Sequence, residues 1–314
     1  MNYYPLVTIQ IPCYNQEKHI SNAINSALNQ NYENLEIIIS DDYSTDSSFL
    51  IAKKFELLSS KVKVYSSNIN IGRVKNYHKL LYKYASGKYV LNLDADDTLT
   101  NYNFITKAVV LLETNINSIM FIGCKSVDNN QNLFHSALNN NLPLIVRGEN
   151  YVFGIPSLYK FSHLTTVYNR NLAITCNFYS KNIISSDKES ILRLALFGNV
   201  ILINEIYGNW NKHLNNTSTN QSFIESVENF LWIKSVSKEL SKINKYKSFI
   251  WELKNRILYS QYLFKSLKTD KTITFRNLYK LFKNFLFFFL LIYILFYYIK
   301  KIYKSIYKIC YYFI

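Results

Sequence analysis

Three carboxylates lie within four positions of one another, at Asp94, Asp96 and Asp97, directly after the apolar run Tyr89–Leu93. Like charges held this closely repel one another, so the cluster is costly unless a cation lies between them. The chain as a whole is basic, with 36 Lys and Arg against 21 Asp and Glu. Spacing alone leaves two interpretations open: a site for a divalent cation, or a solvated acidic turn before the next helix.

The first 124 residues alternate between strand and helix patterns, and these elements must position the carboxylates. Continuous apolar runs predict strands, and apolar residues at helical spacing predict helices. The predicted strands are Leu6–Cys13, Leu35–Ser40, Val62–Tyr65, Tyr89–Leu93 and Ile119–Cys124, and the predicted helices are Lys18–Asn29, Phe49–Leu57, Val74–Tyr84 and Phe104–Glu113. This alternation indicates an α/β fold with a mainly parallel sheet flanked by helices.

Three of these strands end in the most polar residues of the region, at Tyr14-Asn15, Asp41-Asp42 and Asp94–Asp97. Ligands of such sheets bind beyond the carboxyl ends of the strands. We therefore expect the three polar segments to share one cleft, which favours a binding site over a simple turn. Residues 125–185 are rich in Asn and read as irregular, and helical patterns return at Asp187–Phe197, Phe223–Ile243 and Phe249–Leu267.

The C-terminal third of the chain is basic and apolar. Residues 221–314 hold 17 Lys and Arg against 5 Asp and Glu (net +12), whereas residues 1–220 hold 19 against 16 (net +3). Phe285–Ile299 carries no charge, but as a helix it would extend only about 22 Å, short of the roughly 30 Å of a bilayer core. Lys300, Lys304 and Lys308 follow at the spacing of a basic amphipathic helix.

These features predict that residues 276–314 associate with an anionic membrane surface, with a buried helical hairpin or an oligomer interface as the alternative. A nucleic-acid partner is not expected, because the acidic strand ends would repel phosphate in the absence of a metal. No secretory signal is recognised at the N-terminus. The four cysteines lack the paired spacing of zinc or redox motifs, and they are Cys13, Cys124, Cys176 and Cys310.

Five ordered motifs resemble those of family 2 glycosyltransferases of the GT-A fold, of the type that builds bacterial cell-surface glycans. The similarity is continuous over residues 6–125 and extends more weakly to about residue 218. The motifs are Pro12-Cys13-Tyr14-Asn15, Ser26–Gln30, Ser40–Asp46, Asn70–Asn76, and Ala85–Tyr89 leading into Leu93–Asp97.

The resemblance implies an inverting, hexosyltransferase-type transfer from a nucleotide-diphosphate sugar, here a UDP-sugar, to an acceptor hydroxyl. The diphosphate leaving group gains negative charge, which Mn²⁺ or Mg²⁺ would stabilise. Asp94, Asp96 and Asp97 correspond to the family's DXD metal motif, with Asp94 nearer the ribose. The residues implied to bind the donor are Pro12, Tyr14, Asn15, Glu17, Asp41, Asp42, Arg73, Lys75, Asp94 and His213.

Inverting transfer also needs a general base for the acceptor hydroxyl. By resemblance this is Asp187, at the start of a predicted helix, with Glu189 as the second choice. Helix capping is the alternative role for Asp187 and for the Asp41-Asp42 loop. Arg73, Lys75 and His213 could equally have surface or structural roles.

The predicted organisation is a catalytic domain over residues 1–220, a helical region over 221–275 and a membrane-associating tail over 276–314. Within the catalytic domain, residues 1–125 would bind the donor and residues 126–220 the acceptor. The expected setting is lipopolysaccharide or capsule biosynthesis at the cytoplasmic face of the inner membrane. Two alternatives stay open: a polyprenyl-phosphate glycosyltransferase and a non-catalytic scaffold that binds sugar nucleotides.

Overall fold

The structure is a computed structural model, which describes residues 4–127, 145–159, 161–212 and 222–269. The chain divides into two compact units, Met1–Leu214 and Asn215–Ile314. The first unit contains the sheet and every predicted site residue that the structure describes.

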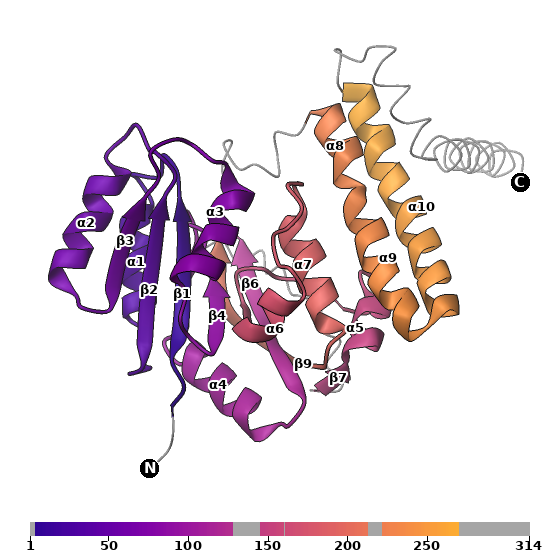
Figure 1. Cartoon of the computed structure of the whole chain (residues 1–314), viewed down its shortest axis with the longest axis horizontal. Helices are drawn as coiled ribbons and strands as arrows, with labels where there is room; N and C mark the ends of the chain where they lie inside the picture. The colour runs from indigo at the N-terminus through magenta and orange to yellow at the C-terminus, as the bar shows by residue number, and fades with distance from the viewer. Residues whose placement is uncertain (1–3, 128–144, 160, 213–221, 270–314) are drawn as a thin grey trace, which may run out of the picture. The chain divides into compact units, whose positions relative to one another are not determined.

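The first unit is built on a nine-stranded sheet with the order β3-β2-β1-β4-β8-β6-β9-β5, in which β7 pairs with β9. Strands β3, β2, β1 and β4 run parallel (Figure 1). Strand β8 is antiparallel to both of its neighbours. The strands are β1 (Val7–Cys13), β2 (Leu35–Asp41), β3 (Val62–Ser66), β4 (Tyr89–Asn92), β5 (Thr98–Leu99), β6 (Ser118–Val127), β7 (Ile145–Arg147), β8 (Thr166–Asn169) and β9 (Asn199–Trp210).

The helices of this unit follow the predicted pattern in the N-terminal half. They are α1 (Ile20–Leu28), α2 (Ser48–Leu58), α3 (Arg73–Lys79), α4 (Phe104–Thr114), α5 (Gly148–Gly154), α6 (Arg170–Thr175) and α7 (Ser186–Ala195). The predicted helix Val74–Tyr84 is present as α3 followed by a π-helical turn, η1 (Leu80–Tyr84). The chain then becomes extended at Ala85, which allows it to enter β4.

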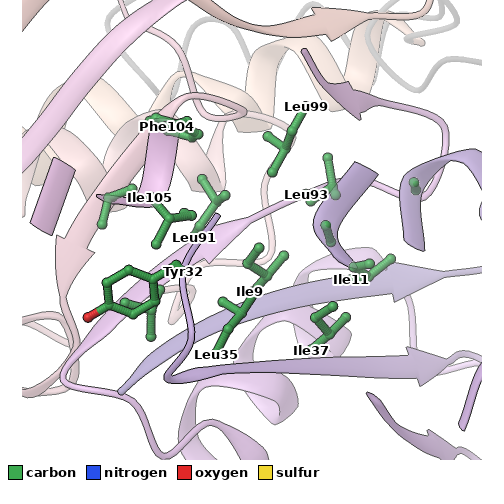
Figure 2. Packing of buried hydrophobic residues seen from close by; sticks show 14 of the residues in the cluster. Ile9, Ile11, Tyr32, Leu35, Ile37, Leu91, Leu93, Leu99, Phe104 and Ile105 are labelled. Carbon is green, nitrogen blue, oxygen red and sulfur yellow. The ribbon is translucent and has the colours of Figure 1, made fainter. Parts of the chain in front are cut away.

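The hydrophobic core fixes the register of the parallel strands. Ile9 of β1 lies opposite Ile37 of β2 and Leu91 of β4, and all three side chains are fully buried. Figure 2 shows them in one cluster with Phe104 of α4. Burying one such aliphatic side chain contributes about 1.5–3 kcal/mol. A shift of one residue would move these side chains to the opposite face, so the polar residues at the strand ends are held at one edge.

The interpretation of residues 125–185 as irregular is wrong for much of that segment. It contains β7, α5, β8 and α6, and β8 inserts between β4 and β6 in the middle of the sheet. Strand β9, which was not predicted, pairs with β6 in parallel orientation. Its register shifts between Ile122 and Cys124 of β6.

The second unit is helical in its described part. It contains α8 (Phe223–Asn229), α9 (Leu231–Ile243) and α10 (Lys245–Thr269), and the predicted helix over Phe223–Ile243 is interrupted at Phe230. Helices α9 and α10 lie side by side (Figure 1), with Trp232 and Trp251 in edge-to-face contact. Among the described helices, none combines the length and apolarity needed to cross a bilayer. The predicted membrane-associating residues 276–314 lie outside the described residues.

Candidate active site

The acidic cluster lies in the tight turn that follows β4. The amide of Asp97 donates to the carbonyl of Asp94 at 3.0 Å, and one carboxylate oxygen from each of Asp94, Asp96 and Asp97 lies within 4.8 Å of the others. The predicted turn is present and gathers the three carboxylates, although it is not fully solvated and is followed by β5 before the next helix. The cation site stays a prediction that this geometry fits. Asp97 is buried, and Asp94 and Asp96 are half-buried.

Two hydrogen bonds orient the ends of this turn. The Tyr77 hydroxyl donates to Oδ1 of Asp94, and the backbone amide of Asn211 donates to Oδ1 of Asp97 at 3.0 Å. Each bond occupies one lone pair of its carboxylate, which leaves further acceptor capacity on both groups. The turn thus presents oriented oxygen ligands.

The electrostatics of the cluster suit a bound cation. Burial and the neighbouring charges of Asp94 and Asp96 raise the pKa of Asp97 well above its ordinary value, although Lys125 and the Asn211 amide oppose the shift. The deprotonated form therefore carries excess negative charge that a cation would neutralise. Hard divalent cations such as Mg²⁺ prefer carboxylate oxygens, so the donor set fits the predicted metal.

Lys125 is a site residue that the sequence analysis missed. It lies on β6, half-buried, with Nζ 4.6 Å from the centre of the Trp210 ring. Burial lowers the pKa of Lys125, and the charges of Asp97, Asp187 and Asp94 oppose that shift. The available signal was a single Lys directly after the apolar run Ile119–Cys124, which was predicted as a strand of the same sheet.

The charges of Asp187 and Asp94 both affect the pKa values of Arg73 and His163. Burial alone would lower the pKa of Arg73, yet Tyr77, Asp187 and Asp94 together raise it above its ordinary value. Burial lowers the pKa of His163, and the charges of both carboxylates counteract that shift. Arg73 also donates to the carbonyl of Ile184, three residues before Asp187, and lies against Tyr77, whose hydroxyl donates to Asp94. Arg73 and Tyr77 therefore connect the segment of the predicted base with the acidic turn. Asp187 lies in the first turn of α7, where the N-cap position belongs to Ser185.

Glu189, the second choice as base, is fully buried in an ion pair. Its Oε1 lies 3.0 Å from Nη1 of Arg193, and its Oε2 accepts from the Ser190 hydroxyl at 3.3 Å. Arg193 also donates to the carbonyl of Cys176. A carboxylate held in this way is poorly placed to take a proton from a substrate, so its position favours Asp187.

The Asp41 and Asp42 carboxylates are buried and organise the loops beside them. Asp42 accepts from the amides of Ile71 and Gly72, each at 2.8 Å. Asp41 accepts from the amide of Ser44 at 2.9 Å. Gly72 has φ = 88°, a conformation that side chains with a Cβ rarely adopt. The predicted donor contacts of Asp41 and Asp42 stay predictions, and the observed role of both carboxylates is to shape the loops.

The loop after β1 lies against the loop after β2. Oδ1 of Asn15 accepts from the Thr45 amide at 2.8 Å, and Oε2 of Glu17 accepts from the Ser47 amide at 3.1 Å. Tyr14 is 46% exposed, so its ring is open to solvent, and the half-buried Pro12 lies opposite Ser40. The expected meeting of the first two strand ends is confirmed.

The remaining predicted residues differ in their surroundings. Nη2 of Arg73 donates to the carbonyl of Ile184 at 2.6 Å, which places it beside the start of α7. Lys75 is exposed on α3. His213 lies outside the described residues.

A buried polar network supports the end of β4. Oδ1 of Asn92 accepts from Nε2 of Gln10 at 2.7 Å and from the Tyr168 hydroxyl at 2.8 Å. Its amide nitrogen donates to the Tyr179 hydroxyl at 2.6 Å, which also lies 3.1 Å from Nε2 of His163. These residues come from well-separated parts of the chain, which is why the sequence did not associate them with the acidic turn.

Comparison with known proteins matches residues 8–180 to Glycosyl transferase family 2. The chain is 30% identical over 251 residues to the chondroitin synthase of Escherichia coli, covering 77% of this chain and 34% of that protein. It is 34% identical over 125 residues to the Escherichia coli UDP-Glc:alpha-D-GlcNAc-diphosphoundecaprenol beta-1,3-glucosyltransferase WfgD, covering 40% of this chain and 48% of that protein. The matched segments therefore span about a third to a half of the length of these relatives.

Solved structures share the fold of the chain at low sequence identity. Staphylococcus aureus TarS in complex with UDP-GlcNAc gives a TM-score of 0.62 at 21% identity, covering 74% of this chain and 66% of that one. The mannosyltransferase PcManGT from Pyrobaculum calidifontis, in complex with GDP-Man and Mn²⁺, gives 0.59 at 13% identity, covering 90% and 80%. These similarities confirm the predicted α/β fold of the GT-A type.

Proposed function

Because the chain belongs to glycosyltransferase family 2, we propose that it transfers a sugar, with inversion, from a nucleotide-diphosphate sugar to a hydroxyl of a cell-surface glycan or lipid-linked acceptor. The observation that carries the proposal is the gathering of Asp94, Asp96 and Asp97 within 4.8 Å. A separate carboxylate, Asp187, begins a helix whose start is bonded to Arg73, which contacts Tyr77, the partner of Asp94. The reaction needs both a cation for the leaving group and a base for the acceptor.

Asp94, Asp96 and Asp97 would hold Mn²⁺ or Mg²⁺. When bound, the cation offsets the negative charge that develops on the departing diphosphate. The ammonium of Lys125 adds fixed positive charge near Asp97. It would also help to hold the diphosphate before and after the sugar leaves.

Asp187 is assigned as the general base. It would accept the proton of the acceptor hydroxyl as the oxygen attacks the sugar, a role that requires a carboxylate near the donor yet separate from the metal ligands. The half-buried position of Asp187 and the burial of Glu189 support this assignment.

The donor is proposed to be a UDP-sugar, since TarS and WfgD carry UDP-sugars in their descriptions. The proposed contacts come from the ends of β1 and β2 and the loops that follow them, from α3, from the turn after β4 and from the segment after β9. They are Pro12, Tyr14, Asn15, Glu17, Asp41, Asp42, Arg73, Lys75, Asp94 and His213.

The proposed domain organisation keeps residues 1–220 as the catalytic domain, with the donor half at 1–125 and the acceptor half at 126–220. Residues 221–275 form the helical region. Residues 276–314 would bind the anionic cytoplasmic face of the inner membrane through their Lys residues. The descriptions of WfgD and chondroitin synthase, which concern a diphosphoundecaprenol-linked acceptor and a polysaccharide, support an acceptor in the same class.

Thermal-shift titration of the full chain with UDP, GDP and a panel of their sugars, with and without Mn²⁺, tests the proposal. A UDP-sugar should raise the melting temperature of the wild type in the presence of Mn²⁺ and much less that of Asp96→Asn. Glu33→Gln, which changes an exposed carboxylate elsewhere, is the control and should behave as the wild type. If no nucleotide diphosphate shifts the melting temperature, the donor site is refuted. Binding without any release of UDP from the donor would instead indicate a scaffold.

A further inference from the structure

We propose that Arg73 and Tyr77, one helical turn apart on α3, are positioning residues that set the acidic turn and Asp187 in a fixed relation to each other. The inference rests on the proposed function, because it takes Asp94 as a metal ligand and Asp187 as the base. For Arg73 this role replaces the donor contact proposed above, and neither Arg73 nor Tyr77 needs to touch the substrate for it.

Tyr77 provides the contact with the acidic turn. Its side chain is fully buried, and its hydroxyl donates to Oδ1 of Asp94. The ring is fixed on its other sides by Tyr179 at 5.0 Å and His163 at 5.4 Å between ring centres. The Tyr77 hydroxyl is therefore held in one position, which fixes the orientation of the Asp94 carboxylate.

Arg73 provides the contact with the segment that carries Asp187. Its Nη2 donates to the carbonyl of Ile184 at 2.6 Å, two residues before α7 begins at Ser186. The guanidinium carbon lies 5.6 Å from the centre of the Tyr77 ring, so the two positioning residues also contact each other. A hydrogen bond from a charged donor to a backbone carbonyl is among the stronger kinds.

A second connection runs from Tyr77 to α7. Tyr179, which stacks on Tyr77, donates its amide to the Ser190 hydroxyl at 2.9 Å. Helix α7 is thus linked to α3 near its start through Ile184 and further along through Ser190. Because Asp187 lies between these two points, its backbone is fixed relative to α3, and α3 in turn fixes Asp94.

This role makes a different prediction from a direct phosphate contact by Arg73. A phosphate contact depends mainly on positive charge, so Arg73→Lys should retain much of it and any loss should be in donor affinity. A positioning role depends on the planar guanidinium, which reaches Ile184 and lies over Tyr77 at once. Lys cannot reproduce both contacts. Misplacing a catalytic group by about 1 Å can cost about 100-fold in rate.

The test compares the full-length wild type with Tyr77→Phe, Arg73→Lys and the double variant. Tyr77→Phe keeps the stacking ring and removes the hydroxyl. Tyr82→Phe is the matched control, because Tyr82 lies on η1 and, within the described part of the chain, its hydroxyl donates at 3.4 Å to the carbonyls of Ile174 and Phe178 and not to the acidic turn. Three quantities are measured: Mn²⁺ affinity in the presence of UDP by electron paramagnetic resonance, kcat and KM for UDP release, and hydrogen exchange of peptides spanning residues 179–192.

Tyr77→Phe should weaken Mn²⁺ binding by about tenfold, the effect of losing a hydrogen bond that orients a metal ligand. Arg73→Lys should lower kcat by about 10–100-fold with KM for the donor and Mn²⁺ affinity changed less than twofold, and should speed exchange near Asp187. In kcat/KM for UDP release, the double variant should lose less than the product of the two single losses, since the two residues contact each other. Tyr82→Phe should match the wild type in all three measurements.

Unchanged Mn²⁺ affinity in Tyr77→Phe, or a loss confined to donor affinity in Arg73→Lys, would overturn the positioning role. So would unchanged exchange near Asp187 in Arg73→Lys. A wild type that binds neither Mn²⁺ nor UDP and releases no UDP would overturn the proposed function instead. The hydrogen-exchange measurement still decides, in that case, whether Arg73 fixes the start of α7.

Discussion

Two neighbouring acids on α7, Asp187 and Glu189, allow chemistry and stability to be separated by matched substitutions. Asp187 is half-buried in the first turn, whereas Glu189 is fully buried in an ion pair with Arg193. Asp187→Asn and Glu189→Gln each replace one carboxylate by the amide of the same shape. We expect the first to abolish turnover and spare the fold, and the second to do the reverse.

The cost of Glu189→Gln follows from the charge that it leaves behind. Removing one partner of a buried ion pair costs about 3–5 kcal/mol, because the other charge stays buried. Arg193 keeps its hydrogen bond to the carbonyl of Cys176, so the lower end, about 3 kcal/mol, is expected. At about 2–4 °C per kcal/mol for a unit of this size, the melting temperature should fall by about 6–12 °C.

The cost of Asp187→Asn to stability should be much smaller. A carboxylate in the first turn of a helix interacts favourably with the helix dipole, and its loss costs about 0.3–1 kcal/mol. The effect on rate should be larger, because a general base contributes about 10²–10⁴-fold to turnover. Asn has no lone pair basic enough to replace it.

Release of UDP from the donor in the presence of Mn²⁺, measured at least about 15 °C below the lowest melting temperature (a margin above the larger expected shift), gives the two rates on folded protein. Calorimetry gives the melting temperatures. Near-wild-type turnover in Asp187→Asn would refute its assignment as base. Loss of turnover in Glu189→Gln without loss of stability would show that the buried acid, and not Asp187, takes part in the chemistry.

Three further predictions concern charge and burial. Lys125→Met should tighten Mn²⁺ binding severalfold at pH 8 in calorimetric titration, because a positive charge near Asp97 is removed; weaker binding would show that the ammonium instead orders the cluster. Burial, with a smaller effect of Asp41, raises the pKa of Cys13 to about 12, so iodoacetamide at pH 8 should label it only after unfolding, and peptide mapping that finds it modified in the native protein would contradict this burial. Burial lowers the pKa of His163, so the stability contributed by its neutral ring is present above its ordinary pKa and is lost as the pH falls through the lowered pKa. The melting temperature should therefore drop more in the wild type than in His163→Gln between pH 7.5 and pH 5, values that bracket the ordinary pKa of about 6.5. Equal drops would exclude His163 as the cause.

The parallel half of the sheet could be predicted because its signals are local. Strands β1, β2 and β4 are short apolar runs, and the helices between them repeat apolar residues at regular spacing. Strand β9 gave no such signal. It is half-buried or exposed in its middle, at Ile203–Ile206, where its register against β6 shifts. Strand β8 is four residues long and falls in an Asn-rich segment, so its apolar pattern is too short to predict a strand.

The site divides along the same line. Asp94, Asp96 and Asp97 are adjacent in the chain, so their clustering could be predicted from the sequence, and a strand before them placed the turn at a sheet edge. The partners of the cluster are distant in sequence: Tyr77 precedes Asp94 by 17 residues, and Asn211 follows Asp97 by 114. Pairs of this kind depend on the tertiary fold, which the periodicity of single segments does not contain.

The acidic turn is consequently a product of both halves of the first unit, although its sequence lies in one. Asn92, two residues before Asp94, accepts hydrogen bonds from Gln10 of β1 and from Tyr168 of β8. Asn211, directly after β9, donates its amide to Asp97. Insertion of β8 between β4 and β6 thus does more than extend the sheet, because it places the Tyr168 hydroxyl on Asn92, which also bonds Tyr179 of the Tyr179–His163 pair. Residues that follow Asp97 by 66 to 114 positions therefore support the acidic turn, and changes in this proposed acceptor half should also alter donor chemistry.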